Sequence, residues 1–116
     1  MLPAAEQGDR EAQSSLAWQY LAGYGVDQDD ASAFHWYGQA AQAGDATAQF
    51  MLAQLYRDGK GTDRDNVSAY RWFKVAVASG VTIDGTESLK PRMTPEEVAA
   101  GEAQAKIWLE GRLKPR

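Results

Sequence analysis

The stretch Ala4-Ala5-x-x-Gly8-Asp9-x-x-Ala12-Gln13 decides the fold, because it recurs 36 residues later as Ala40-Ala41-x-x-Gly44-Asp45-x-x-Ala48-Gln49. A period of roughly 20 to 50 residues is typical of solenoids, whose units bury their apolar faces only by stacking on one another. The sequence therefore predicts a stack of similar units. Folds of this kind usually bind other macromolecules.

The similarity between the two copies continues along the rest of the repeat. Leu16, Ala17, Tyr20, Gly23, Gly25, Asp27, Asp29, Ser32, Ala33 and Trp36 return as Leu52, Ala53, Tyr56, Gly59, Gly61, Asp63, Asp65, Ser68, Ala69 and Trp72. The spacing of Ala12, Leu16 and Tyr20 places them on one face of a helix, and so does the spacing of Ala33, Trp36 and Ala40. Each repeat is therefore predicted to hold two amphipathic helices, with the recurring Tyr and Trp side chains in the core.

The composition sets limits on the class of protein. The chain has 116 residues, enough for one domain, and no cysteine, so it can form neither a disulfide nor a zinc–thiolate site. No apolar stretch approaches the roughly 18 to 20 residues that span a bilayer, and the first residues do not resemble a signal peptide. We expect a soluble protein without membrane insertion, and the sequence does not decide between cytoplasm and periplasm.

The charge is distributed unevenly along the chain. Residues 1–89 carry twelve acidic and six basic side chains, a net charge of −6, whereas residues 90–116 carry four acidic and six basic ones, a net charge of +2. Proteins that bind nucleic acids usually present a basic face to the phosphates. The repeats have the opposite bias, so we expect no nucleic-acid partner.

The repeat boundaries predict one domain over residues 1–116. It comprises a remnant helix at 2–7, repeat one at 9–44, repeat two at 45–80, a loop at 81–93 and a terminal helix at 94–111. Within the repeats, helices are expected at 10–21, 30–43, 46–57 and 66–79, because glycines suit the helix ends and aspartates the helix starts. Ala4 and Ala5 align with Ala40 and Ala41, which predicts that the chain opens inside a helix with no cap before it.

The pattern breaks after Gly80. Val81 stands where an aspartate is due, and the β-branched run that follows opposes a new first helix. The string Thr94-Pro95-Glu96-Glu97 has the pattern of a capping box, so a helix is expected to begin there and to cap the array. Trp72 and Trp108 are also 36 residues apart, but the residues between them do not fit a third copy, and we interpret this spacing as coincidence.

These residues resemble the Sel-one-like repeat (SLR) family, a relative of the tetratricopeptide repeats with a unit of 36 residues. The resemblance covers residues 4–80 and depends on Gly8-Asp9, Ala12-Gln13, Leu16, Tyr20, Gly23-x-Gly25-Val26, Asp29, Ala33-x-x-Trp36-Tyr37 and Ala40-Ala41-x-x-Gly44-Asp45. It implies an all-α fold, a right-handed α/α superhelix of about two helix-turn-helix repeats plus a terminal helix. It also implies an adaptor or scaffold for protein complexes, common in bacteria, and no catalysis. Thr62 and Val77 depart from the pattern at the positions of Val26 and Ala41.

Other motifs do not point to an enzyme or a cofactor. Gly59-Lys60-Gly61-Thr62 lacks the order of a phosphate-binding loop, and no strand precedes it. His35 is the single histidine, and its counterpart is Arg71, which indicates a tolerant, solvent-facing position. Asp27, Asp29 and Asp30 do not have the spacing of a calcium loop and are better explained as helix caps. We expect no catalytic residues, metal or cofactor.

Positions at which the copies differ are better candidates for binding, because the fold requires neither residue there. Trp18 becomes Gln54, and Ser14 becomes Phe50. By analogy with other α-solenoids, the first helices line the concave face. The candidate binding residues there are Glu11, Ser14, Trp18, Leu21, Thr47, Phe50, Gln54 and Arg57. The alternative for Trp18 and Phe50 is packing against neighbouring repeats.

Two functions are compatible with these features. In the first, the chain is a protein–protein interaction module that binds a segment of a partner protein on its concave face. In the second, it self-associates into homo-oligomers through the uncapped N-terminal end, because an incomplete first unit exposes an apolar edge.

Overall fold

The computed structural model describes residues 5–113, and all of its regular elements are helices. They are α2 (Arg10–Ala22), α3 (Asp30–Gln42), α4 (Ala46–Asp58), α5 (Asn66–Ala78), the 3-10 helices η1 (Gly85–Ser88) and η2 (Lys90–Arg92), and α6 (Pro95–Leu113). No strand occurs in this part of the chain. The predicted all-α fold class is confirmed. Of the helix expected at 2–7, residues 5 and 6 are helical, and residues 2–4 lie outside the described residues.

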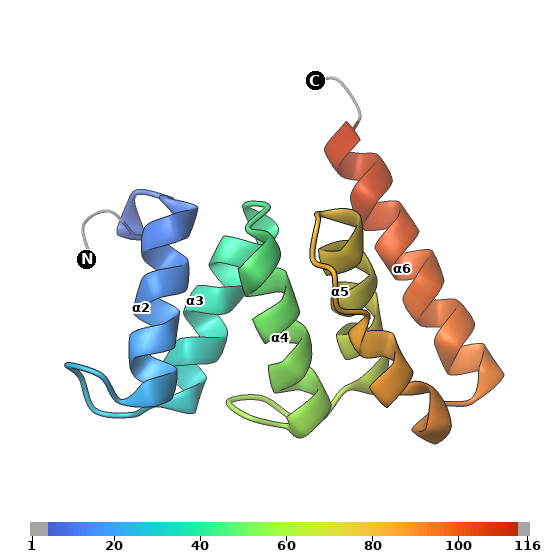
Figure 1. Cartoon of the computed structure of the whole chain (residues 1–116), viewed down its shortest axis with the longest axis horizontal. Helices are drawn as coiled ribbons and strands as arrows, with labels where there is room; N and C mark the ends of the chain where they lie inside the picture. The colour runs from blue at the N-terminus through green and yellow to red at the C-terminus, as the bar shows by residue number, and fades with distance from the viewer. Residues whose placement is uncertain (1–4, 114–116) are drawn as a thin grey trace.

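The first four helices form two hairpins that stand side by side (Figure 1). α2 packs along α3, α4 packs along α5, and contacts between α3 and α4 join the two hairpins. Each of these helices begins at the residue expected from the sequence and ends within one residue of the expected end. The fold is therefore a solenoid of two helix-turn-helix repeats, followed by α6, which packs along α5.

Aspartates determine where these four helices begin. Asp9 accepts hydrogen bonds from the backbone N–H groups of Glu11 and Ala12, at 3.0 and 3.1 Å. Asp29 caps α3 in the same way and also accepts a bond from Ser32 Oγ at 2.8 Å, a contact that lowers the pKa of its carboxyl group. Asp45 and Asp65 cap α4 and α5. Side-chain acceptors of this kind satisfy N–H groups that have no partner within the helix.

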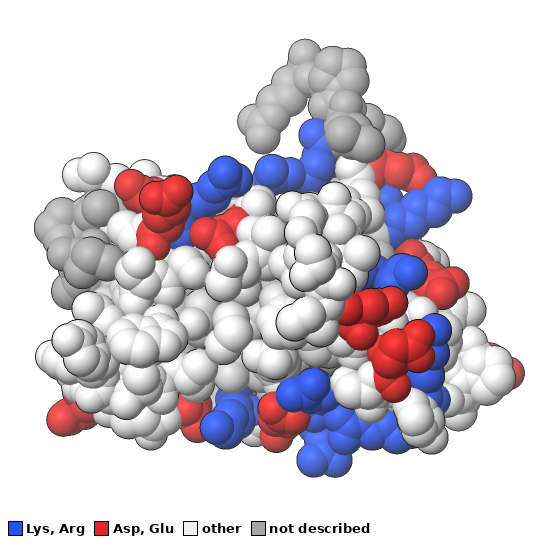
Figure 2. Space-filling view, viewed as in Figure 1, with Lys and Arg blue, Asp and Glu red and all other residues white. Residues whose placement is uncertain are grey.

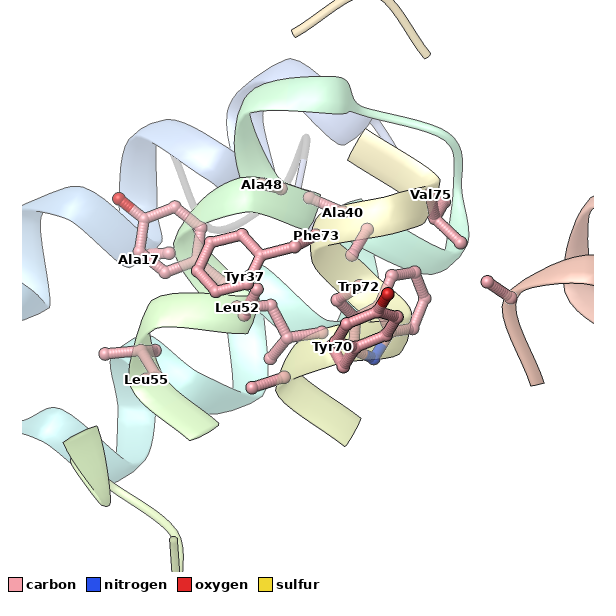
Figure 3. Close-up of a cluster of buried hydrophobic side chains, with 14 of the residues drawn as sticks. Ala17, Tyr37, Ala40, Ala48, Leu52, Leu55, Tyr70, Trp72, Phe73 and Val75 are labelled. Atoms are coloured by element: carbon pink, nitrogen blue, oxygen red, sulfur yellow. The ribbon is translucent and has the colours of Figure 1, made fainter. Parts of the chain in front are cut away.

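The core combines many alanines with a few large side chains (Figure 3). Ala17, Ala33, Ala40, Ala48, Ala53 and Ala69 are fully buried, and they pack with Tyr37, Leu52, Leu55, Tyr70, Trp72 and Phe73. The small residues let neighbouring helices approach closely, and the large ones fill the space between repeats. Trp72 is 1% exposed, while Tyr20, Tyr56 and Trp36 are partly buried against the same cluster.

Two buried glutamines connect each first helix to the residues before it. Gln13 Nε2 donates to the carbonyl oxygen of Ala5 at 3.0 Å, and Gln49 Nε2 donates to that of Ala41 at 3.2 Å. The two bonds are equivalent, since both partners are shifted by 36 residues. This explains why Gln ends the repeated stretch, because an apolar residue there would leave this bond unmade.

The segment expected as a loop at 81–93 contains the two 3-10 helices. Asp84 caps η1 by accepting bonds from the N–H and the hydroxyl of Thr86, and these bonds lower its carboxyl pKa. Thr86 and Leu89 are buried, and the Cα of Gly85 lies so close to the Phe73 ring that any Cβ there would collide with it. The segment therefore packs directly on α5, where Phe73 lies.

Helix α6 begins as its sequence predicts and continues the stack. The N–H of Thr94 donates to Glu97 Oε1 at 2.9 Å, and the N–H of Glu97 donates to Thr94 Oγ1 at 3.1 Å, which is a complete capping box. Further along the helix, Tyr70 Oη donates to Glu102 Oε1 at 3.0 Å. The end of the array is thus covered by α6.

Trp72 and Trp108, whose spacing of 36 residues is interpreted from the sequence as coincidence, are in contact in the structure. Their rings meet edge to face, with centroids 5.5 Å apart. Ala105, which is 36 residues after the buried Ala69, is buried as well. Trp108 and Ala105 of α6 thus pack on α5 near the residues 36 positions before them. The segment with η1 and η2 stands before α6 where a repeat would have its first α-helix.

A pair of glycine substitutions tests the packing of α3 and α6. Gly38 lies inside α3, where an added Cβ would have no atom within 4 Å, so Gly38→Ala is expected to raise the free energy of unfolding by about 0.5–1 kcal/mol. In Gly101→Ala the Cβ would lie 2.7 Å from Cδ1 of the buried Tyr70, and we expect a net loss of stability. Urea unfolding followed by circular dichroism measures both changes. Equal effects of the two substitutions would contradict this packing.

The contact between α5 and α6 also predicts how stability depends on alkaline pH. Burial, followed by the hydrogen bond to Glu102, raises the pKa of Tyr70 to about 12. An unfolded tyrosine has a pKa near 10, so the folded state holds this proton more tightly, and stability should fall as the pH rises from about 10 towards 12. Urea unfolding across this range should give a shallower decrease for Tyr70→Phe than for the wild type. Parallel curves would rule out this role of Tyr70.

Candidate functional site

The first helices of the two repeats present an uncharged surface. Residues 13–22 of α2 and residues 46–56 of α4 contain no Asp, Glu, Lys or Arg. Figure 2 shows that residues other than Lys, Arg, Asp and Glu cover the middle of this face, over α2 and α4. The charged side chains gather towards its edges. A surface of this kind favours an uncharged partner over a nucleic acid or a strongly charged peptide.

A groove with a volume of about 380 Å³ lies between α2 and α4. We call it the α2–α4 groove, and it is lined by Ser14, Ser15, Trp18, Gln19, Tyr24, Tyr37, Thr47 and Met51. α2 and the loop after it supply one wall, and α4 supplies the other. The lining combines aromatic rings and a methionine with hydroxyl and amide groups, which is the mixture found in many binding sites.

Two exposed aromatic side chains mark one wall of the α2–α4 groove. Trp18 is 48% exposed and Tyr24 is 66% exposed. Their rings lie with centroids 5.4 Å apart and planes inclined by 48°, so they support each other. Large aromatic residues are usually buried in a core or used at an interface, and neither of these rings is needed by the repeat.

Tyr37 of α3 also lines the α2–α4 groove. It is 2% exposed, and burial, followed by the nearby carboxylate of Asp45, raises the pKa of its hydroxyl group to about 12. The phenol therefore stays protonated at neutral pH. A protonated phenol of this kind can donate a hydrogen bond.

The structure separates the eight residues that the sequence suggested for binding. Ser14, Trp18 and Thr47 line the α2–α4 groove. Glu11 is exposed, and Leu21 and Gln54 are partly buried outside the lining of the groove. Phe50 and Arg57 face α5, so the set does not form one continuous site.

Phe50 and Arg57 take part in packing around Phe73. The rings of Phe50 and Phe73 have centroids 5.4 Å apart, and the guanidinium carbon of Arg57 lies 5.9 Å from the Phe73 centroid. Arg57 also pairs with Asp58 at 3.0 Å and donates to Ser88 Oγ at 3.4 Å. For Phe50, these contacts correspond to the packing alternative that the sequence left open, whereas Trp18 is half-exposed at the groove.

Sequence reasoning missed Tyr24 and Met51 on the walls of the groove. A signal for both was present, because the copies differ at these positions: Tyr24 corresponds to Lys60, and Met51 corresponds to Ser15. Both residues follow the rule that pointed to Trp18. They were overlooked because Tyr24 lies in a loop rather than on a helix and Met51 has the residue type of a core position.

Two features are absent from residues 5–113. None of the helices there has both the length and the apolar character needed to cross a membrane. In the same residues, no three His, Cys, Asp or Glu side chains are grouped so that they could hold a metal ion.

Solved structures of two other proteins are similar to this fold. The first is a protective antigen present in uropathogenic Escherichia coli strains and displaying an SLR fold; it is 28% identical, covers 97% of this chain and gives a TM-score of 0.87. The second is a Sel1 repeat protein from Oxalobacter formigenes, which is 41% identical, covers 76% of this chain and gives a TM-score of 0.70. The chain spans 27% of the length of the first and 65% of the second. No curated protein matches the chain significantly.

The family comparison agrees with the repeat boundaries seen in the structure. The model of the Sel1 repeat matches twice, at residues 10–45 and 46–81. Each match begins with the first helix of a hairpin and ends after the second. Together they span more than half of the 116 residues. The chain therefore belongs to the Sel1 repeat family, the family that its sequence resembles.

Proposed function

We propose that this chain is an adaptor that binds an uncharged segment of a partner protein in the α2–α4 groove. Proteins with Sel1 repeats generally act as scaffolds for protein–protein interactions and are typically not enzymes. The observation that carries the proposal is the exposed pair of Trp18 and Tyr24 on an otherwise uncharged face.

The composition of the groove supports a protein partner. Trp and Tyr are enriched at the centres of protein interfaces, where they bury a large area with little loss of side-chain entropy. Met51 on the opposite wall adds a flexible apolar contact. Ser14, Gln19 and Thr47 supply donors and acceptors for the backbone of a bound segment.

The lack of charge in the groove indicates the chemistry of the segment. A charged side chain that entered the α2–α4 groove would lose its hydration without gaining an opposite charge, which is unfavourable. The bound segment is therefore apolar or neutral where it meets Trp18 and Tyr24. Its charged residues lie outside, near the edges of the face shown in Figure 2.

Trp18→Ala is expected to weaken binding of the partner at least tenfold, a change of about 1.4 kcal/mol, because it removes the central aromatic contact. The partner is first identified by affinity capture with the wild-type chain and mass spectrometry. Calorimetric titration with the identified segment then gives the affinity of each variant. Circular dichroism should remain unchanged, since Trp18 is half-exposed and does not cap a helix.

Ile107→Ala is the matched control for this experiment. Ile107 is 70% exposed on α6, so its substitution removes an exposed apolar side chain far along the chain from the groove. Wild-type affinity is expected for this variant. Equal weakening by both substitutions, or none by Trp18→Ala, would disprove the groove assignment.

Capture of only the chain itself would favour the alternative function, self-association. Sedimentation at several concentrations measures self-association directly.

A further inference from the structure

A second hollow joins the two repeats on another part of the surface. It has a volume of about 270 Å³ and lies between α3 and α5, with Leu52 and Tyr56 of α4 also lining it. The lining residues with polar groups are His35, Gln39, Gln42, Tyr56, Arg71 and Trp72, and no Asp or Glu lines it. We propose that this hollow, the α3–α5 site, binds a carboxylate group. Such binding does not depend on the function proposed for the α2–α4 groove.

Two residues that line the α3–α5 site carry buried donors with no acceptor among residues 5–113. Within residues 5–113, neither Nε1 of Trp72 nor Nε of Arg71 has a hydrogen-bond partner, although both atoms are buried. Trp72 as a whole is 1% exposed. Native proteins pair nearly all buried donors, because an unpaired one loses its hydration without compensation. Arg71 and Trp72 both line the hollow, so a small shift of the Arg71 side chain would let an acceptor bound there reach these covered donors.

The Arg71 side chain is held in position without an acidic partner. Its guanidinium carbon lies 4.9 Å from the centroid of the Trp72 ring, an arrangement that holds the planar group in place. Among the described residues, none of the ion pairs within 4.0 Å involves Arg71. A fixed guanidinium group without a carboxylate partner is well suited to bind one through two parallel hydrogen bonds.

The amide group of Gln42 adds a donor to the site. Nε1 of Trp108 donates to Gln42 Oε1 at 3.0 Å, which fixes the orientation of this amide. Its oxygen is therefore occupied, and its NH₂ group remains as a donor at the α3–α5 site. His35, at the position in repeat one that corresponds to Arg71, adds a ring N–H in either protonation state. The side chains at the site thus include several donors.

Gly38 makes the α3–α5 site more open. It lies inside α3 at the position that corresponds to Lys74 in repeat two, and an added Cβ would have no atom within 4 Å. Packing therefore does not require a glycine, which weakens a helix interior. A longer side chain on α3 would project beside His35 and Gln42 and narrow the entrance.

The charge and size of the site favour a carboxylate over a phosphate. Arg71 is the one residue with a permanent positive charge among those lining the site, so it balances the single charge of a carboxylate rather than the nearly double charge of a phosphate. The volume lies slightly below the range usual for drug-sized ligands. It suits a small acid or a single acidic side chain of a partner.

The test is a titration of the full chain followed by nuclear magnetic resonance of the Trp72 indole N–H. One arm uses propionate, a free small acid with a single carboxylate, and another uses N-acetylglutamate amide, which represents the side chain of a partner. Salt is adjusted so that the ionic strength stays constant. A saturable shift of the Trp72 resonance is expected at millimolar concentrations. The tighter of the two probes identifies the source of the carboxylate.

Arg71→Met removes the charge but keeps a chain that can cover Trp72, and it is expected to weaken the binding of both probes at least tenfold. Lys74→Met is the matched control, because it removes one positive charge from the same helix at a residue that does not line the site. It should change the affinity less than twofold. Circular dichroism checks that both variants keep their helices.

Three results would overturn the proposal. The first is the absence of a Trp72 shift with either probe at tens of millimolar. The second is an equal loss of affinity in Arg71→Met and Lys74→Met, which would indicate a general effect of charge. The third is tighter binding of inorganic phosphate than of both carboxylates, since this would contradict the charge of the site.

Discussion

The hydrogen bonds of Gln13 and Gln49 hold successive helices of the solenoid in register. Each amide is buried and reaches a carbonyl eight residues earlier, near the end of the preceding helix. Carbonyl groups at helix ends have fewer partners within their own helix, so the bond satisfies them as well as the Nε2 group of each glutamine, whereas neither Oε1 atom has a partner among the described residues. Since a helix that slides or rotates breaks this contact, the bond limits how the next hairpin can be placed. The caps and the alanine contacts then act on helices whose relative position is already restricted.

Close approach of the helices explains why the surface is free to differ between repeats. The buried positions that recur are mostly alanines, so the backbones define the distance between helices. Residues that point away from these contacts have no fixed role in the stack. At such positions repeat one carries Trp18 and Tyr24, and repeat two carries Gln54 and Lys60. The same scaffold therefore presents different chemistry at equivalent places, and this difference produces the α2–α4 groove.

The sequence predicts those parts of the structure that the repeat requires, because the capping aspartates, the buried alanines and the helix boundaries each occur twice. The partners of Phe50 and Arg57 were not predictable in this way, since helix periodicity gives the face of a residue but not what covers it. They contact Phe73 and Ser88 near η1, whose short turn has no periodicity that a sequence pattern reveals. The α3–α5 site is lined by side chains from three helices, α3, α4 and α5, and was not predicted for the same reason. The α2–α4 groove was partly accessible, because the comparison of the two copies indicated Trp18.

The contacts of α6 with α3 have a consequence for how the molecule unfolds. In most solenoids a unit touches only its immediate neighbours, and the ends can fray while the middle stays folded. Here Trp108 donates to Gln42 Oε1, and Arg112 donates to the Gln42 carbonyl oxygen, so the last helix reaches back past α5 to the first hairpin. Melting of the C-terminal end thus removes contacts from both hairpins at once. This arrangement couples the hairpins into one cooperative unit.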